Sequence, residues 1–502
     1  MKFKFPLNKF HYLSFFFLFS LLSVTAQENE DIENKLDYHI ERQLVFGSGN
    51  NPLWFNANKY GLSSINPNNG YLRLGINGIQ RLGETEKWTL DYGADAAAAY
   101  NFTSTIIIQQ LYAGIKYKKI GFCLGSKERP ANMKNAELSS GSQTFGINAR
   151  PIPDIRIEIP EYTPLLRNKN WLSFKFHLGY GITTDQNWQK QFAAQGTRYN
   201  SRFFCHTKSA FFKIGDEDLF PIIAEGGFES ATQFGGTSYN TYNLLSRNVK
   251  CSSSLKDFFY ALYGGGSDPT DVYKNALGNT LGSWLFSLSY KLGEARARIY
   301  LDHFFEDHSQ LFFQYGWRDG LYGCEFTFPK NPFIGSFVYE YIRTDDQSGA
   351  VYHDANSTLP DQISAVDNYY NHLIYTGWQH WGQAIGNPLF TSPLYNKDHN
   401  IYFHNNRFRG HHFGINGNPL RSIHYRLLYT YSENWGTYEI PFDDKKYDTS
   451  FLGEVTFSLK HLGHWNISGN SIRCAFAFDR GHLMGNNTGF QIGFISNGLF
   501  KM

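Results

Sequence analysis

The chain has 502 residues, of which 42% are hydrophobic, 18% aromatic and 18% charged. So much apolar material excludes a disordered chain, and beyond Ala26 no apolar run approaches the ~18 to 20 residues that a membrane-spanning helix needs. Lys and Arg (46) nearly balance Asp and Glu (44), and no basic block is present, which excludes a nucleic-acid-binding surface. The 47 Gly, 33 Tyr and 45 Phe residues favour β-structure.

The first residues are typical of an export signal. Its basic positions are Lys2, Lys4 and Lys9. An apolar stretch follows at 13–22, and the small residues at 24–26 are typical of a cleavage site. We therefore expect residues 1–26 to be a cleaved signal peptide and residues 27–502 to form a single exported domain.

From Trp88 to Tyr100, apolar residues alternate with polar or small ones. The alternation places Leu90, Ala94 and Ala98 on one face of a strand, which we interpret as the lipid-facing side. On this interpretation Ala96 faces lipid and Ala97 faces the opposite side. The same pattern returns at 72–77, 172–182, 284–292, 296–302, 423–432, 451–459 and 490–494.

The length of these runs decides between two kinds of β-protein. Strands of soluble domains are typically about 5 to 6 residues long, whereas a tilted transmembrane strand needs about 9 to 11. Many of the runs reach the second length, and aromatic residues such as Trp88 and Tyr431 stand at their ends, as in an interfacial girdle. The sequence predicts an all-β fold, a transmembrane antiparallel barrel of about 16 to 18 strands. A secreted all-β domain with aromatic strands is the alternative.

Two segments interrupt the alternation. Residues 255–278 carry helix start and stop signals and predict two short helices, and residues 139–164 are rich in Pro, Gly and Asn and predict a long ordered loop. A barrel of this width has an aqueous lumen unless something fills it. We expect these segments to plug the barrel; the alternative is that both decorate its outside.

Several strings of the sequence can be compared with known families. Residues 352–396 read YHDANSTLPDQISAVDNYYNHLIYTGWQHWGQAIGNPLFTSPLYN, and further characteristic stretches are 139–165, 303–341, 405–419 and 425–442. They resemble the Wzi-like capsule-assembly proteins of the Bacteroidetes outer membrane, over essentially the whole mature chain. The resemblance implies an 18-stranded outer-membrane barrel, helices occluding its periplasmic end, and a lectin that holds capsular polysaccharide at the cell surface.

The segment 352–396 also has the composition of a sugar-binding wall. Flat aromatic faces stack on sugar rings, and carboxylates, amides and imidazoles bond to the hydroxyls. The candidate glycan-binding residues are Asp354, Asp361, Tyr369, His372, Trp378, His380 and Trp381. The same residues are also compatible with a purely structural role, the tryptophans as membrane-interface anchors and the carboxylates as turn caps.

Catalytic and metal sites have weaker support. His303, Glu306, His308 and Ser309 lie close together in sequence, but neighbours on a strand point to opposite faces, so His308 and Ser309 cannot readily pair. The histidines near His411 lack the spacing of a metal site. We expect no enzyme, no metal and no cofactor.

The expected partners are capsular polysaccharide and outer-membrane lipid, including lipopolysaccharide, around a monomer. Two alternative functions share the same barrel. A diffusion porin would need an open lumen, and a lipid-processing enzyme would need a Ser/His pair that the sequence does not reveal.

The cysteines are widely separated along the chain. They are Cys123, Cys205, Cys251, Cys324 and Cys474. A disulfide framework or a zinc site requires pairs or close spacings, so the sequence predicts five separate thiols.

Overall fold

The computed structural model describes residues 34–500, apart from 84–86, 167–168, 242–247, 267–276, 307–316, 352, 354–355, 362–364 and 463–464. The signal peptide expected at 1–26 therefore lies outside the described residues. None of the helices in the described part of the chain is long and apolar enough to cross a membrane.

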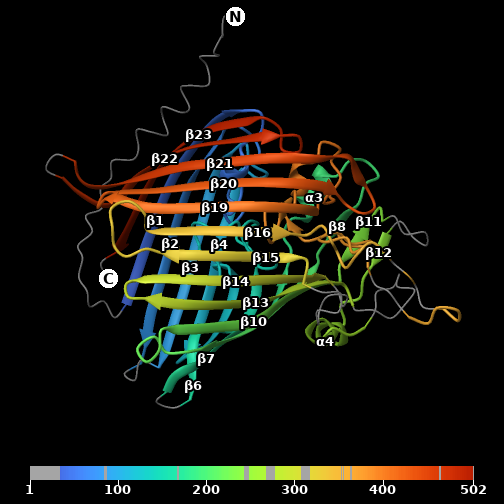
Figure 1. Cartoon of the computed structure of the whole chain (residues 1–502), viewed down its shortest axis with the longest axis horizontal. Coiled ribbons are helices and arrows are strands. Elements are labelled where there is room, and N and C mark those ends of the chain that lie inside the picture. The colour runs from blue at the N-terminus through green and yellow to red at the C-terminus, as the bar shows by residue number, and fades with distance from the viewer. Residues whose placement is uncertain are drawn as a thin grey trace, which may run out of the picture.

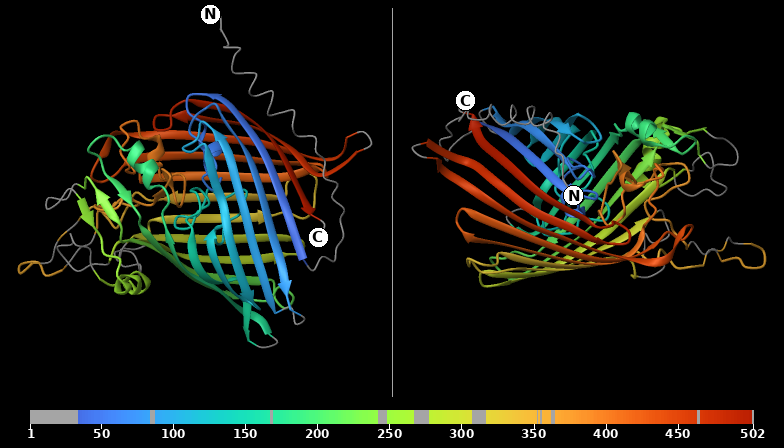
Figure 2. Two further views of the ribbon diagram at one scale, coloured as in Figure 1. Left: turned by 180° about the vertical axis from the view of Figure 1, so that it is seen from behind. Right: turned by 90° about the horizontal axis from the view of Figure 1, so that it is seen from above.

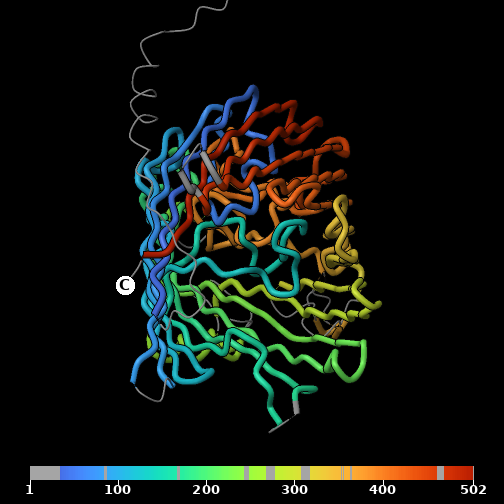
Figure 3. The backbone as a smooth tube through the Cα atoms, turned by 90° about the vertical axis from the view of Figure 1, so that its left-hand side faces the viewer, coloured from blue at the N-terminus to red at the C-terminus, as the bar shows by residue number. Residues whose placement is uncertain are grey.

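The fold is a closed antiparallel barrel in which each strand pairs with the next along the chain (Figures 1 and 3). The pairing of β1 with both β2 and β23 closes the ring. The wall strands are β1 (Asn34–Ser48), β2 (Asn69–Leu82), β3 (Trp88–Tyr100), β4 (Ile106–Tyr117), β5 (Ile120–Ser126), β6 (Asp154–Leu166), β7 (Lys169–Ile182), β9 (Phe204–Ile214), β10 (Ile222–Phe234), β13 (Asn279–Leu292), β14 (Ala295–Glu306), β15 (Gly320–Thr327), β16 (Ser336–Arg343), β19 (Arg407–Leu420), β20 (Ile423–Gly436), β21 (Pro441–Leu462), β22 (Trp465–Gly481) and β23 (Asn487–Phe500). The 18-stranded sheet confirms the expected barrel and the strand number that the resemblance implied.

The alternation along β3 is the one expected from the sequence. Ala94, Ala96 and Ala98 are exposed on the outside of the wall, whereas Ala97 is 2% exposed. Trp88 and Tyr100 stand exposed at the two ends of the strand, where an interfacial girdle belongs. The alternation of apolar with polar or small residues along a strand therefore predicts which side chains face lipid and which face the lumen.

The two ends of the barrel differ. Short turns, such as 118–119 and 421–422, join the strands at the end where β1 begins and β23 stops. Long segments, such as 127–153 and 344–406, leave the wall at the opposite end. The small elements β8 (Tyr199–Ser201), β11 (Thr237–Tyr239), β12 (Asn248–Lys250) and α3 (Gln186–Phe192) lie at that end (Figures 1 and 2). The segments that leave there also contain β17 (Gln379–His380), β18 (Gln383–Ala384), α2 (Leu53–Asn56) and η2 (Pro393–Tyr395). Outer-membrane barrels have short periplasmic turns and long extracellular loops, so the long-loop end is the outer end.

The helix expected after Ser254 is present as α4 (Leu255–Tyr263). Ser254 and Asp257 form a reciprocal capping box, which satisfies backbone N–H groups at the start of the helix. Gly264 ends the helix with φ of 76°, a left-handed conformation that glycine adopts without steric cost. The second helix expected toward Leu277 falls mainly on 267–276, outside the described residues.

The position of α4 differs from the expected plug at the periplasmic end. Phe258 of α4 packs against Phe204 and Phe234. These rings point outward, because Cys205 and Ala231, an odd number of residues away on the same strands, line the lumen. The segment joins β10 to β13 at the long-loop end, so α4 lies outside the wall near the outer rim (Figure 1). Helix signals are local and do not specify on which side of the wall a helix docks.

The segment that fills the lumen is the stretch between β5 and β6. We call residues 127–153 the plug; the loop expected at 139–164 divides at Asp154, where β6 begins. We call residues 365–406 the cap. Plug, cap and α2 contribute to one buried core inside the barrel, together with wall residues. Among its members are Trp54, Leu138, Val338, Ile342, Tyr369, Tyr370, Trp378, Phe390, Phe403, Phe408 and Leu428.

A pair of arginine substitutions tests which side chains of the wall face lipid and which face the lumen. Ala96→Arg places a cation toward lipid and is expected to cost roughly 2 kcal/mol or more, lowering the yield of heat-modifiable, folded barrel. The matched control is Asn77→Arg, because Asn77 lines a lumenal cavity of about 560 Å³ that can accommodate the charge. Ala97 is a poor control, since it packs against Leu62 and Ile107. Equal folding yields for the two variants would contradict the assignment.

Candidate functional site in the lumen and the cap

The plug is tethered to the far wall by a buried carboxylate. Glu340 of β16 is 0% exposed and accepts hydrogen bonds from Ser139 Oγ at 2.6 Å, Ser140 N at 2.7 Å and Ser140 Oγ at 2.5 Å. Tyr300 of β14 adds its hydroxyl at 2.6 Å. A buried carboxylate is tolerated only with such donors, so the consecutive serines give the plug a specific seat.

Two further wall carboxylates hold the plug in the same way. Asp302 of β14 accepts from Gln143 N at 3.2 Å and forms an ion pair of 2.9 Å with Lys134. Glu229 of β10 accepts from Asn132 Nδ2 at 2.9 Å. The plug is therefore fixed to three separate strands of the wall.

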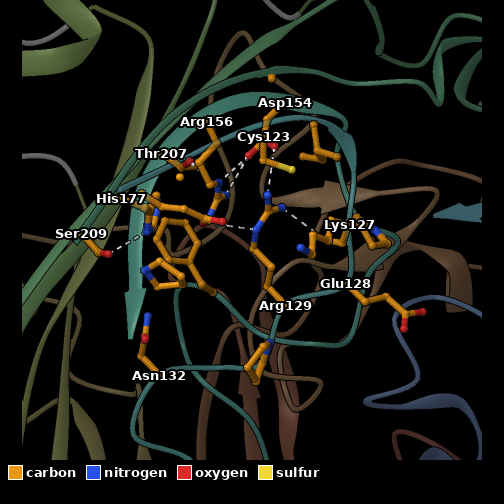
Figure 4. Close-up of a pocket in the computed structure, with 18 of the residues that line it drawn as sticks. Cys123, Lys127, Glu128, Arg129, Asn132, Asp154, Arg156, His177, Thr207 and Ser209 are labelled. Atoms are coloured by element: carbon orange, nitrogen blue, oxygen red, sulfur yellow. Dashed lines mark hydrogen bonds and ion pairs between the residues drawn. The ribbon is translucent and has the colours of Figure 1, made fainter. Parts of the chain in front are cut away.

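A cavity of about 700 Å³ remains beside the plug (Figure 4). It extends from Phe145 and Trp378 to Lys116 and Lys118 near the short turns. Two of its arginines pair with wall acids: Arg156 lies 2.8 Å from Asp154, and Arg129 lies 3.6 Å from both Asp154 and Glu158. Lys127 pairs with Asp91 at 2.5 Å. Four further cations, Lys116, Lys118, Arg150 and Lys175, also line the cavity, so its cations outnumber its carboxylates.

The cavity also holds a serine–histidine pair that the sequence did not reveal. Ser209 Oγ lies 2.7 Å from His177 Nδ1, because the two residues are direct cross-strand partners on β9 and β7. Within the described residues, no group hydrogen-bonds to His177 Nε2. A catalytic pair needs a third group that orients the imidazole, so this arrangement is typical of a cross-strand contact.

Three of the predicted glycan-binding residues are core residues of the cap. Tyr369, Trp378 and His380 are each at most 1% exposed. Tyr369 donates its hydroxyl to Asp319 at 3.1 Å. His380 Nε2 accepts from Thr184 N at 3.2 Å. Side chains so deeply packed cannot present a stacking face to a polysaccharide, which corrects the expectation for these three.

The other predicted residues are scattered. Asp361 is exposed, and Asp354 lies outside the described residues. His372 Nδ1 accepts from the backbone N–H groups of Ile374 and Tyr375 at 3.0 and 3.3 Å, so the imidazole is a turn cap. The structure therefore does not gather the six described candidates into one wall.

Trp381 is the predicted residue that retains a partly exposed ring. It stands in the tight turn between β17 and β18 with φ of 56°, and its backbone N donates to Asp185 at 3.0 Å. The Arg150 guanidinium lies 4.3 Å from the centre of its ring. The indole is thus held between a cation and an apolar cluster that contains Trp188 and Leu394, and it stays partly exposed.

A second partly exposed group on the cap was missed by the sequence reasoning. The rings of Tyr402 and His404 lie 5.4 Å apart, and His404 Nε2 lies 3.1 Å from Asp398. Tyr402 donates its hydroxyl to Glu439 at 3.2 Å. Phe403 between them is 0% exposed. The available signal in the sequence was the tyrosine and histidine rings at 402 and 404 beside Asp398.

No family model and no curated protein matches the sequence. Among solved structures, the fold is similar to Wzi of Escherichia coli, described as a carbohydrate-binding β-barrel involved in group 1 capsule assembly. The TM-score is 0.53 at 12% identity, over 92% of this chain and 84% of Wzi.

Two further outer-membrane barrels are similar at lower scores. OccK5 of Pseudomonas aeruginosa has a TM-score of 0.47 at 10% identity, over 93% of this chain and 99% of that one. An OmpT loop-deletion mutant of Vibrio cholerae has a TM-score of 0.39 at 9% identity, over 93% and 100%. The closed 18-stranded wall and its likeness to Wzi identify this protein as an outer-membrane β-barrel.

The plug can be tested by conductance. Replacing residues 131–147 by a short Gly-Ser linker removes the tethers to the wall and the support of the cap, so single-channel conductance in planar bilayers should rise several-fold. The control replaces α4 (Leu255–Tyr263), which lies outside the wall and should leave conductance unchanged. The reverse ranking of the two variants would place the occluding segment in α4.

The cap should loosen in acid. Burial lowers the pKa of His372 to about 3, and its two N–H donors require the neutral imidazole. An unfolded histidine titrates near pH ~6.5, so the unfolded cap binds the proton first. The neutral His372 imidazole therefore stabilises the folded cap fully above pH ~6.5, and this stabilisation is lost as the pH falls toward 3. The protection factors of the amides in residues 370–376, which are corrected for the intrinsic pH dependence of exchange, should therefore fall between pH 7 and pH 5.

A non-titrating variant provides the control for this effect. His372→Gln keeps a side-chain acceptor but takes up no proton. The protection factors of the amides in residues 370–376 should therefore depend less on pH in this variant. Burial also lowers the pKa of His380, which accounts for a residual dependence. Identical pH profiles in the two proteins would show that His372 does not control the cap.

Proposed function

We propose that this protein is a non-enzymatic lectin of the outer membrane that holds capsular polysaccharide at the cell surface through the outer face of its cap. The observation that carries the proposal is the occluded lumen: plug and cap are packed into one core with the wall. Because the interior is filled at the outer end, the cap's outward-facing groups are the ones available to extracellular ligands.

The chemistry of the cap supports a glycan ligand. Trp381 offers a flat aromatic ring, and Tyr402 and His404 stand beside the carboxylates of Asp398 and Glu439. Aromatic faces and hydroxyl-binding groups are what sugar recognition requires. The resemblance of the sequence to capsule-assembly proteins points the same way, and so does the similarity of the fold to Wzi, which is described as a carbohydrate-binding barrel.

The two alternative functions fit less well. A diffusion porin requires an open path, whereas Glu229, Asp302 and Glu340 hold the plug across the lumen. An enzyme requires an oriented base, and among the described residues the Ser209–His177 pair has no carboxylate at Nε2.

Substitution of the exposed aromatics tests the lectin proposal. Trp381→Ala combined with Tyr402→Ala removes two stacking faces worth ~1 kcal/mol each, and their loss should lower affinity about 30-fold. A polysaccharide chain engages many copies of the protein, so the retention of capsule at the cell surface should fall by a larger factor than the affinity of a single site. Cells with this variant should release capsule into the medium while the folded barrel is present in normal amount.

Two controls separate binding from folding. Trp171→Ala removes an aromatic ring that is 42% exposed near the short turns and should leave capsule retention unchanged. Trp378→Ala opens a core cavity costing ~3 to 5 kcal/mol and should instead reduce folded barrel. Normal retention of capsule by the Trp381/Tyr402 variant would move the binding surface elsewhere.

A further inference from the structure

The outward face of β16, β19, β20 and β21 is arranged in cross-strand rows. Strand register places Tyr339 beside Phe413, Phe413 beside Tyr429, and Tyr429 beside Phe451. The next row toward the outer end contains Tyr341, His411 and Tyr431. These rows face lipid, because the intervening residues Val338, Glu340, His412 and Thr430 are buried inside.

Above the aromatic rows the same face becomes charged. Arg343 pairs in register with Arg409, and Arg409 with Glu433. Arg407 and Lys445 lie one step further toward the outer rim on their strands. We call Arg343, Arg407, Arg409 and Lys445 the outer cationic band.

Carboxylates and an aromatic ring organise the band. Asp345 accepts from Arg343 Nε at 2.7 Å and from Arg409 Nη2 at 2.7 Å. Trp435 lies between Arg409 and Lys445, whose charged groups are 5.3 and 5.4 Å from the centre of its ring. Glu433 is bound to Lys445 at 3.1 Å. Asp345 is thus shared by two arginines of the band.

The remaining cation of the band is held by an aromatic ring. The Arg407 guanidinium carbon lies 3.6 Å from the centre of the Tyr438 ring, and its Nε donates to the Asp345 carbonyl at 3.2 Å. These contacts fix the side chain while leaving most of its N–H donors free of a carboxylate. Arg409 is also accessible, with 39% of its side chain exposed.

The height of the band in the membrane identifies its surroundings. Leu427, near the middle of the outward stripe of β20, is followed six residues later by Glu433. At about 3.3 Å per residue and a tilt of about 40°, the band stands roughly 15 Å from the midplane. The apolar layer of an outer-membrane barrel is about 25 Å tall, so these cations lie at the level of the lipid headgroups on the long-loop side.

We propose that the outer cationic band binds the phosphate groups of an anionic outer-leaflet glycolipid, lipopolysaccharide, whose acyl chains lie against the aromatic rows below. Arginine forks match phosphate oxygens and form charge-assisted hydrogen bonds. The ring of Trp435 provides a flat face beside them for the headgroup sugar. This site lies on the lipid-facing wall and is separate from the cap surface proposed to bind capsule.

Binding of a defined lipid tests the proposal. Full-length protein purified in detergent is mixed with bis-phosphorylated lipid A, and complexes are counted by native mass spectrometry. The variant Arg343→Gln/Arg409→Gln/Lys445→Gln should bind at least about tenfold more weakly, since each lost charge-assisted contact is worth 1.4 kcal/mol or more. The control Lys119→Gln/Lys291→Gln/Arg296→Gln removes three exposed cations near the short turns and should retain full affinity.

Two further probes identify the ligand class. Lipid A stripped of phosphate should bind wild-type protein as weakly as phosphorylated lipid A binds the band variant. An acidic polysaccharide, such as polygalacturonate, should bind wild type and band variant equally. Equal binding of phosphorylated lipid by wild type and the folded, heat-modifiable band variant would overturn the proposal. Loss of polysaccharide binding without loss of lipid binding would also overturn it and assign the band to capsule.

Discussion

The structure depends on three carboxylates that face the inside of the barrel. Glu229, Asp302 and Glu340 lie on different wall strands and are 0% exposed. An ionised carboxylate buried without donors is strongly unfavourable, so the wall requires a partner that supplies them. The plug supplies serine hydroxyls, backbone N–H groups and Lys134. The wall thereby determines the path of the plug.

The cap depends on the plug in turn. Tyr370 donates its hydroxyl to the Gln143 carbonyl, and Asn387 Nδ2 donates to the Gly141 carbonyl at 3.1 Å. Asn148 Nδ2 donates to the Ala384 carbonyl at 2.9 Å. These bonds link the wall to the outer surface through two successive layers. The turn that carries Trp381 is positioned at the end of this series of contacts.

The barrel also divides its surroundings into three environments. The lumen keeps a cavity lined by charged side chains, some of them paired, as in Arg156 with Asp154. The lipid-facing side carries α4 near the rim of β10 and, on β16 to β21, aromatic rows below the outer cationic band. The cap presents aromatic and acidic groups to the exterior. The side chains in each environment match its dielectric constant. A charged group avoids a large free-energy penalty only beside water, lipid headgroups or an opposite charge.

The sequence by itself determined the wall, because a period of two survives in any strand that has lipid on one side, as at Ala94 and Ala96. It also determined that α4 is a helix, since capping residues act locally. Only the tertiary structure decided that α4 docks outside, that residues 127–153 fill the lumen, and that Trp378 is core while the Trp381 ring stays partly exposed. Tyrosines, tryptophans and asparagines serve a polar core as well as a sugar-binding wall, so their burial depends on contacts far away in sequence.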